Sequence, residues 1–197
     1  MSDSETLSVY AAKAQDYANL TESVNSKDPC LRAFIQAIPK AGDVLDLGCG
    51  PGASAAAMAR AGLKVTAYDP VPEMIALAGK HAGVNAQLAG FTDVNGIDIF
   101  DGIWANFSLL HAVRRDMPDH LARIATALKP GGRFHIAVKT GAGSQRDNIG
   151  RYYTYYEEDE LNTLLTDAGL TVIERREGLG KGLAGDVSPW IALAAHA

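Results

Sequence analysis

The amino-acid sequence predicts an α/β fold: a doubly wound, mostly parallel sheet with helices on both faces and a helical extension at the amino terminus. Two observations favour this fold. An apolar segment at 44–47 leads into glycines at 48, 50 and 52 and then into a helical pattern, and later apolar segments alternate with helical patterns as far as residue 195. A chain of 197 residues suffices for one core, so we expect a single domain over 1–197.

The first 40 residues contain two helical patterns, at 7–20 and 29–38. Tyr10 and Tyr17 are seven residues apart, which places them on one face of the first predicted helix. Such a pair either packs against the rest of the domain or covers a ligand, and the pattern leaves both interpretations open.

Residues 44–52 begin a unit of strand, turn and helix. The apolar residues suit a strand that is buried on both faces, and the glycines allow a sharp turn after it. Residues 53–61 are rich in good helix formers, and Gly62 follows them. This order directs backbone N–H groups and the positive end of a helix dipole toward a ligand.

A second strand is predicted at 64–68, and Asp69 follows it, 19 residues after Gly50. A carboxylate at this position suits hydrogen bonds from both hydroxyls of a ribose. We therefore expect a nucleotide-type cofactor between the glycine loop and Asp69. The simpler alternative is that Asp69 caps a helix beginning near Val71.

Two cofactors match this unit. Gly48, Gly50 and Ala53 fit the G-x-G-x-x-A pattern of dinucleotide-binding proteins, which would indicate a nicotinamide oxidoreductase. Asp46 opposes that interpretation because it would repel a pyrophosphate, and Pro51 lacks an N–H that a phosphate needs. S-adenosylmethionine has no phosphate and two positive groups, so the residues favour this cofactor.

The rest of the chain continues the alternation. We predict a helix at 116–128, with Leu121, Ile124 and Leu128 on one face and a stop at the Pro-Gly-Gly of 130–132. A further helix is predicted at 158–168, and both helices are expected to be scaffold. Runs of apolar and β-branched residues predict strands at 86–88, 99–105, 134–139, 171–174 and 190–195.

With the stretch VLDLGCGPG at 44–52, the chain resembles the class I S-adenosylmethionine-dependent methyltransferases from about Val44 to Trp190. The resemblance implies a Rossmann-like sheet of seven strands in the order 3-2-1-4-5-7-6 at 41–197, and a helical lid at 1–40. It also implies which residues contact the cofactor. At the methionine end these are Asp46, Gly48, Cys49 and Gly50, and at the ribose and adenine they are Asp69, Pro70 and Met74. Gly90 and Phe91 would lie beside the adenine, and Asn106 and Tyr17 of the lid would make further contacts.

Two positions in this set need comment. Many members of the family carry an aspartate where this chain has Gly90, so we expect Phe91 stacking or Asp93 to replace it at the adenine. Cys49 is expected to be a small packed residue rather than a nucleophile.

The loop at 106–111 follows the fourth predicted strand, and the resemblance implies that it runs beneath the transferring methyl group. It lacks the N-P-P-Y sequence of amino-group methylases of DNA. His111 is the best candidate for a general base, because an imidazole accepts a proton near pH 7. The alternative is a structural histidine.

The loop at 140–156 is the second place where an acceptor would bind. Its glycines would allow opening and closing. Arg146 and Arg151 would pair with a carboxylate or phosphate of the acceptor, beside Tyr153 and the lid's Tyr10. The alternative is a solvated loop whose tyrosines pack on the edge of the sheet.

Composition limits the partners. A net charge of −5 and a pI near 5.5 argue against a nucleic-acid substrate. Two cysteines give no disulfide framework, the polar start is unlike a signal peptide, and no apolar run approaches the ~20 residues of a membrane helix. We therefore predict a cytoplasmic monomer or homodimer that has no metal and no membrane partner.

Together these features predict methyl transfer from S-adenosylmethionine to a small-molecule acceptor by in-line attack on the sulfonium methyl. Catalysis would depend mainly on alignment and exclusion of water, with a general base only if the acceptor must lose a proton. The alternatives are an NAD-dependent oxidoreductase and a module that binds S-adenosylmethionine without catalysis.

Overall fold

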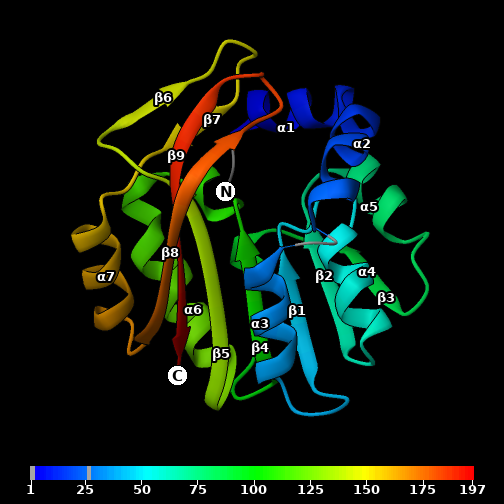
Figure 1. Ribbon diagram of the computed structural model, residues 1–197, viewed down its shortest axis with the longest axis vertical. Helices are drawn as coiled ribbons and strands as arrows, with labels where there is room; N and C mark the ends of the chain where they lie inside the picture. Colours follow the sequence, from blue (N-terminus) through cyan, green and yellow to red (C-terminus); the bar gives the residue numbers. More distant parts are fainter. Residues whose placement is uncertain (1–2, 26–27) are drawn as a thin grey trace.

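The computed structural model describes residues 3–25 and 28–197, and one large sheet dominates it (Figure 1). Its seven strands lie in the order β3-β2-β1-β4-β5-β9-β8, and β9 alone runs antiparallel to its neighbours. Counted within this sheet, the order is 3-2-1-4-5-7-6, so the predicted doubly wound fold is confirmed. The strands are β1 (Asp43–Leu47), β2 (Lys64–Asp69), β3 (Val84–Leu88), β4 (Phe100–Asn106), β5 (Leu128–Lys139), β8 (Thr171–Lys181) and β9 (Val187–His196).

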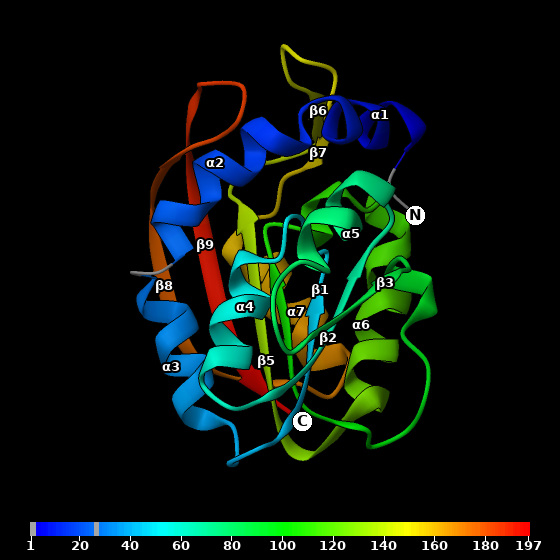
Figure 2. The same ribbon diagram turned by 90° about the vertical axis from the view of Figure 1, so that its right-hand side faces the viewer.

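Helices form a layer on each face of the sheet (Figure 2). Each layer buries its own cluster of apolar side chains against the strands. The helices on one face are α3 (Pro29–Ala37), α4 (Ala53–Arg60) and α5 (Pro72–Ala78), and those on the other face are α6 (Met117–Ala127) and α7 (Glu158–Asp167).

The central strand β1 shows why both layers are needed. Val44 belongs to the cluster formed with α3 and α4, whereas Leu45 and Leu47 belong to the cluster formed with α6 and α7. None of the three side chains is more than 1% exposed. Burying each one stabilises the fold by about 1.5–3 kcal/mol, so a strand of this composition is stable only between two layers.

Three segments cross the edge of the sheet where the parallel strands end (Figures 1 and 2). In open parallel sheets this edge is where ligands bind. Short 3₁₀ turns, η1 (Phe91–Asp93), η2 (Leu109–His111) and η3 (Arg114–Asp116), follow β3 and β4 at the same edge. The crossing segments are α1 (Ser4–Ala12), α2 (Ala14–Asn25) and the hairpin of β6 (Ser144–Arg146) and β7 (Tyr152–Thr154).

The predicted helix at 7–20 is in fact two helices. The chain turns at Lys13 between α1 and α2, so the prediction that Tyr10 and Tyr17 share one face of a single helix is wrong. The two rings still meet edge to face, with centroids 5.4 Å apart. No glycine or proline marks the turn, and burial of both rings at the sheet edge outweighs the preference for a continuous helix.

Two strands extend beyond the apolar runs that predicted them. β5 begins at Leu128, which pairs with Phe100. The Pro-Gly-Gly at 130–132, which we predicted to follow the helix as its stop, therefore lies inside the strand. β8 continues to Lys181 through a glycine-rich segment, because β9 pairs with it along this whole length. Pairing with a neighbouring strand, rather than local propensity, sets these boundaries.

Gly102 of β4 leaves the space into which α3 packs. A Cβ at this position would lie 2.5 Å from Ile38 Cδ1 and 2.7 Å from Phe34 Cζ. We therefore expect Gly102→Ala to lower the free energy of unfolding by about 1–3 kcal/mol, which thermal unfolding would register as a fall in Tm of roughly 3–10 °C. Gly182→Ala is the matched control, since the nearest atom there is 3.8 Å from the new Cβ. An equal Tm for both variants would contradict this packing.

Candidate functional site

The loop after β1 fixes three glycines at the ligand-binding edge. Gly48, Gly50 and Gly52 have φ values of 76°, 53° and 84°, a left-handed region that other residues avoid. Gly48 also permits a close approach, because a Cβ there would lie 2.3 Å from the Cβ of Ser108. Ser108 Oγ donates a hydrogen bond to the Leu47 carbonyl at 2.6 Å, so the loop is held against the end of β4.

Asp69 ends β2 and connects this loop to the next helix. Its Oδ2 accepts a hydrogen bond from the Gly50 N–H at 2.9 Å, and its Oδ1 accepts one from the Val71 N–H at 2.9 Å. Burial raises the pKa of Asp69 to about 6, although both hydrogen bonds act in the opposite direction. The carboxylate thus organises the turn before α5 and also faces the cavity at this edge.

Asp46, near the end of β1, is 2% exposed. Burial raises its pKa to about 7, and its Oδ2 lacks a hydrogen-bond partner among the residues that the structure describes. Leaving a buried carboxylate oxygen unpaired costs free energy. A cation near the glycine loop would offset this cost, whereas a pyrophosphate would increase it.

This edge of the sheet contains a cavity of about 60 Å³. Typical ligand pockets measure roughly 300–1,000 Å³, so the small volume indicates that the amino-terminal helices lie close against the sheet. The predicted site residues that line it are Tyr10, Tyr17, Gly48, Gly50, Asp69, Pro70, Met74, Phe91, Asn106 and His111. Lining residues that the sequence prediction did not assign to a site are Thr6, Leu7, Val71, Phe107 and Ser108.

Three predicted cofactor residues do not line this cavity. Asp46 and Cys49 are buried, and burial raises the pKa of the Cys49 thiol, as for a packed residue. The Gly90 N–H donates to Asp93 Oδ2 at 2.7 Å. Of the two residues expected to replace an aspartate at Gly90, Asp93 therefore already binds its own turn, whereas Phe91 lines the cavity.

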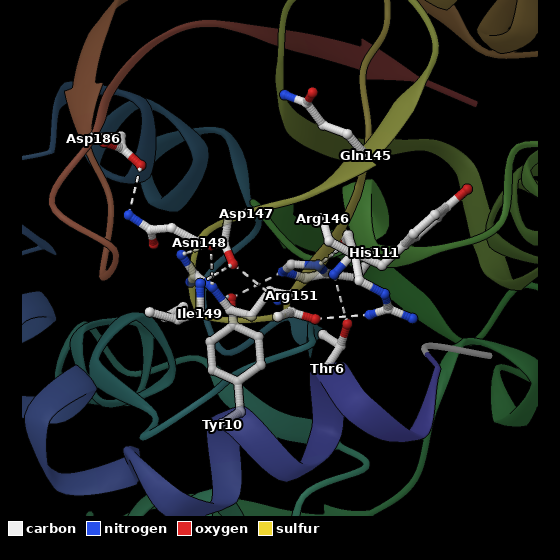
Figure 3. A network of polar contacts seen from close by, with 12 residues as sticks. Thr6, Tyr10, His111, Gln145, Arg146, Asp147, Asn148, Ile149, Arg151 and Asp186 are labelled. Atoms are coloured by element: carbon white, nitrogen blue, oxygen red, sulfur yellow. Dashed lines mark hydrogen bonds and ion pairs between the residues drawn. The ribbon is translucent and has the colours of Figure 1, made fainter.

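A chain of hydrogen bonds joins α1, η2 and the β6–β7 hairpin (Figure 3). Arg151 Nη1 donates to Tyr10 Oη at 3.0 Å, Tyr10 Oη lies 2.9 Å from His111 Nε2, and His111 Nδ1 lies 2.6 Å from the Tyr152 carbonyl oxygen. Because a carbonyl only accepts, Nδ1 carries the proton and Nε2 accepts from Tyr10. Burial lowers the pKa of His111 to about 4, which keeps the ring neutral.

The two arginines predicted to bind the acceptor have partners within the protein. Arg151 is 2% exposed and pairs with Asp147 at 2.7 Å. Arg146 pairs with Asp3 at 2.9 Å and with Glu5 at 3.2 Å. The contacts of Arg146 fasten the hairpin to the start of α1. Tyr153 of the hairpin is buried, and its ring lies 4.7 Å from that of His111.

Asn106 is oriented by a residue that the sequence prediction left unassigned. His135 Nε2 lies 3.1 Å from Asn106 Oδ1 and must donate, because an amide oxygen only accepts. The buried His135 ring stacks on Trp104 with centroids 3.6 Å apart. A histidine within an apolar strand was the available signal, but its partner became evident only from the pairing of β4 with β5.

Within residues 3–25 and 28–197, no group of three or more His, Cys, Asp or Glu side chains is placed to hold a metal ion. The helices in the described part of the chain include none that is both long and apolar enough to cross a membrane.

Known proteins resemble this chain in the region of the cavity. A family profile described as "Methyltransferase domain" matches residues 44–132. The ubiquinone biosynthesis O-methyltransferase of Methylobacterium nodulans is 32% identical over 152 residues, which cover 66% of this chain and 60% of that protein. The ubiquinone/menaquinone biosynthesis C-methyltransferase UbiE of Rubrivivax gelatinosus is 39% identical over 108 residues, which cover 52% and 42%. The chain thus spans about half the length of the curated relatives it matches.

A solved structure extends the likeness to almost the whole chain. The 1,6-didemethyltoxoflavin-N1-methyltransferase of Burkholderia thailandensis, with bound 1,6-didemethyltoxoflavin and S-adenosylhomocysteine, has a TM-score of 0.71 and 26% identity, covering 96% of this chain and 87% of that one. TehB from Haemophilus influenzae has the same fold, with a TM-score of 0.71 at 19% identity. The profile match contains the glycine loop, Asp69 and Asn106, whereas α1, α2 and the hairpin lie outside it.

Tyr10→Phe removes the hydroxyl between Arg151 and His111. Two buried groups would lose a hydrogen-bond partner, so we expect the free energy of unfolding in urea to fall by about 1–3 kcal/mol. Tyr155→Phe is the control, because its hydroxyl bonds to the exposed Gln145 side chain at 3.0 Å and to no other side chain in the described part of the chain. Nitrogen-15 NMR should find the His111 proton on Nδ1. Equal stability of the two variants would argue against this hydrogen-bond chain.

Proposed function

Because this chain belongs to the class I S-adenosylmethionine-dependent methyltransferases, we propose that it transfers a methyl group from S-adenosylmethionine to a small-molecule acceptor. The observation that carries the proposal is the meeting of the glycine loop, Asp69 and Asn106 at one cavity beneath α1 and α2. The relatives named above are methyltransferases for different molecules. That the acceptor of this protein is a small molecule is therefore part of the proposal.

The residues at this edge suit S-adenosylmethionine, which supplies a methyl group on a positively charged sulfonium. Each Asp69 oxygen keeps lone-pair capacity for a ribose hydroxyl beyond its backbone hydrogen bond. The unpaired Asp46 oxygen would stabilise the positive amino group of the methionine part. Further contacts would come from Tyr17 on the lid side and from Gly48, Gly50, Pro70, Met74 and Phe91 on the sheet side.

The alternative cofactor and the non-catalytic alternative fit less well. A nicotinamide dinucleotide would place its pyrophosphate near Asp46, one of whose oxygens lacks a partner in the described structure. A module that only binds the cofactor would not use the Tyr10–His111 pair beside the cavity as a proton acceptor. The lid role of residues 1–40, a cytoplasmic location and a monomeric or dimeric state stay predictions.

We place the acceptor beside Tyr10 and His111. Since Tyr10 Oη–H occupies His111 Nε2, the acceptor's proton would pass to Tyr10 Oη while the Tyr10 proton passes to Nε2. The methyl carbon gains a bond to the acceptor as its bond to sulfur breaks. His111, with its pKa lowered to about 4, is a weak base, and such a base serves an acceptor that is itself acidic.

Ligand stabilisation tests the proposal. At about 100 times its dissociation constant, S-adenosylhomocysteine should add ~2.7 kcal/mol and raise the Tm of the ligand-stripped protein by roughly 5–10 °C, whereas NADH should have no effect. Asp69→Asn should weaken binding by about 1.5–3 kcal/mol, and Asp119→Asn, an exposed acid on α6, should leave it unchanged. Stabilisation by NADH alone would overturn the proposed cofactor.

The buried acids predict how cofactor affinity depends on pH. Below pH 7 Asp46 becomes protonated in the free protein, so the positive amino group of the ligand loses its partner. Calorimetric titration should therefore show S-adenosylhomocysteine affinity rising from pH 5.5 to about 7 and then levelling off. Asp46→Asn should retain only the dependence near pH 6 that Asp69 causes. The same pH profile in both proteins would remove Asp46 from the site.

A further inference from the structure

Lys139, the last residue of β5, is a half-buried cation at the ligand-binding edge. Its Nζ lies 4.1 Å from the centroid of the Tyr153 ring. Among the residues whose placement the structure gives, no carboxylate lies within 4.0 Å of this ammonium group. The neighbouring cation Arg151 lies over the same ring, but it has Asp147 as a partner.

The surroundings leave Lys139 short of negative charge. Burial and the nearby Arg151 both lower its pKa, and they outweigh the two carboxylates that act on it from a distance, Asp147 and Asp186. Asp147 is engaged by Arg151, and Asp186 lies on the exposed turn between β8 and β9, where it contacts Asn148 (Figure 3). An acidic group that docked at Lys139 would complete an ion pair.

Aromatic rings connect Lys139 to the cavity. Trp190 of β9 stands opposite Lys139 in the β5–β9 register. Its ring lies over Gly178 and Gly180 of β8, where added Cβ atoms would come within 2.7 Å and 3.2 Å of it. Trp190 also meets the Phe107 ring edge to face at 6.1 Å, and Phe107 lines the cavity. The two glycines therefore make room for the Trp190 ring beside Phe107.

The spacing along β5 suggests the size of a ligand. Asn106 at the cavity pairs with Ala137, and Lys139 lies two residues further along the strand, or about 7 Å. A molecule with its reacting atom near Asn106 and an acidic group at Lys139 would be one or two aromatic rings long. Its flat faces would match the rings of Phe107 and Trp190.

We propose that Lys139 determines acceptor specificity by binding the carboxylate of an aromatic acceptor that lies against Phe107 and Trp190. The inference rests on the proposed function, and it names the class of acceptor for the same site. A phenolic hydroxyl on such an acceptor is more acidic than an aliphatic hydroxyl, so it suits the weak base at His111 better.

The test is a panel of matched pairs: hydroxylated benzoates, naphthoates and indole carboxylates, each compared with its own carboxamide. Binding to protein saturated with S-adenosylhomocysteine is measured by saturation-transfer NMR and calorimetry. We expect the carboxylates to bind more tightly than the carboxamides. Lys139→Gln should weaken the carboxylates about tenfold, leave the carboxamides unchanged and keep the affinity for S-adenosylhomocysteine.

Two further variants separate recognition from a structural role. Lys139→Arg keeps the positive charge and should restore most of the preference for carboxylates. Lys181→Gln removes an exposed lysine at the end of β8 and should change nothing. The proposal is overturned if no carboxylate of the panel binds, if acids and amides bind equally, or if Lys139→Gln weakens both. Failure of S-adenosylhomocysteine to bind the wild-type protein would instead overturn the proposed function.

Discussion

The buried guanidinium of Arg151 determines the arrangement of the parts that cover the sheet edge. A charge with 2% exposure cannot stay unpaired without a large cost, so Asp147 folds back on it within the hairpin. One nitrogen remains for Tyr10 of α1, and the Tyr10 hydroxyl in turn donates to the unprotonated Nε2 of His111. The positions of the hairpin, of α1 and of the proposed base therefore all depend on pairing the buried charge of Arg151.

The candidate site has opposite polarity at its two ends. Two buried carboxylates lie beside the glycine loop, Asp46 of β1 and Asp69 of β2, and one oxygen of Asp46 lacks a partner in the described structure. The far end holds Arg151, whose charge Asp147 balances, and Lys139, which has no carboxylate within 4.0 Å among the residues that the structure places. The carboxylates at the first end would stabilise a cationic cofactor, and the ammonium group at the second end would stabilise an acidic acceptor.

Local features of the site were predictable from the sequence, and long-range features were not. The glycine loop and Asp69 follow from residues 44–69, because a strand, a turn and a helix determine where they lie. The sheet order came from the family resemblance, since pairing between distant strands leaves little local signal. The turn at Lys13 and the bond between Tyr10 and Arg151 depend on contacts across more than 100 residues. The environment of Lys139 depends on how the hairpin folds back over β5, which the residues around Lys139 do not indicate.

The fastening of α1 has a consequence for the order of folding. Tyr10 meets His111 101 residues later in the chain, and Thr6 accepts a hydrogen bond from the Tyr152 N–H, 146 residues later. Contacts of such sequence separation form slowly, because a long loop must close before they stabilise anything. Helix α1 is synthesised before η2 and the hairpin, so its bonds to them form only after the chain has been synthesised past Tyr152.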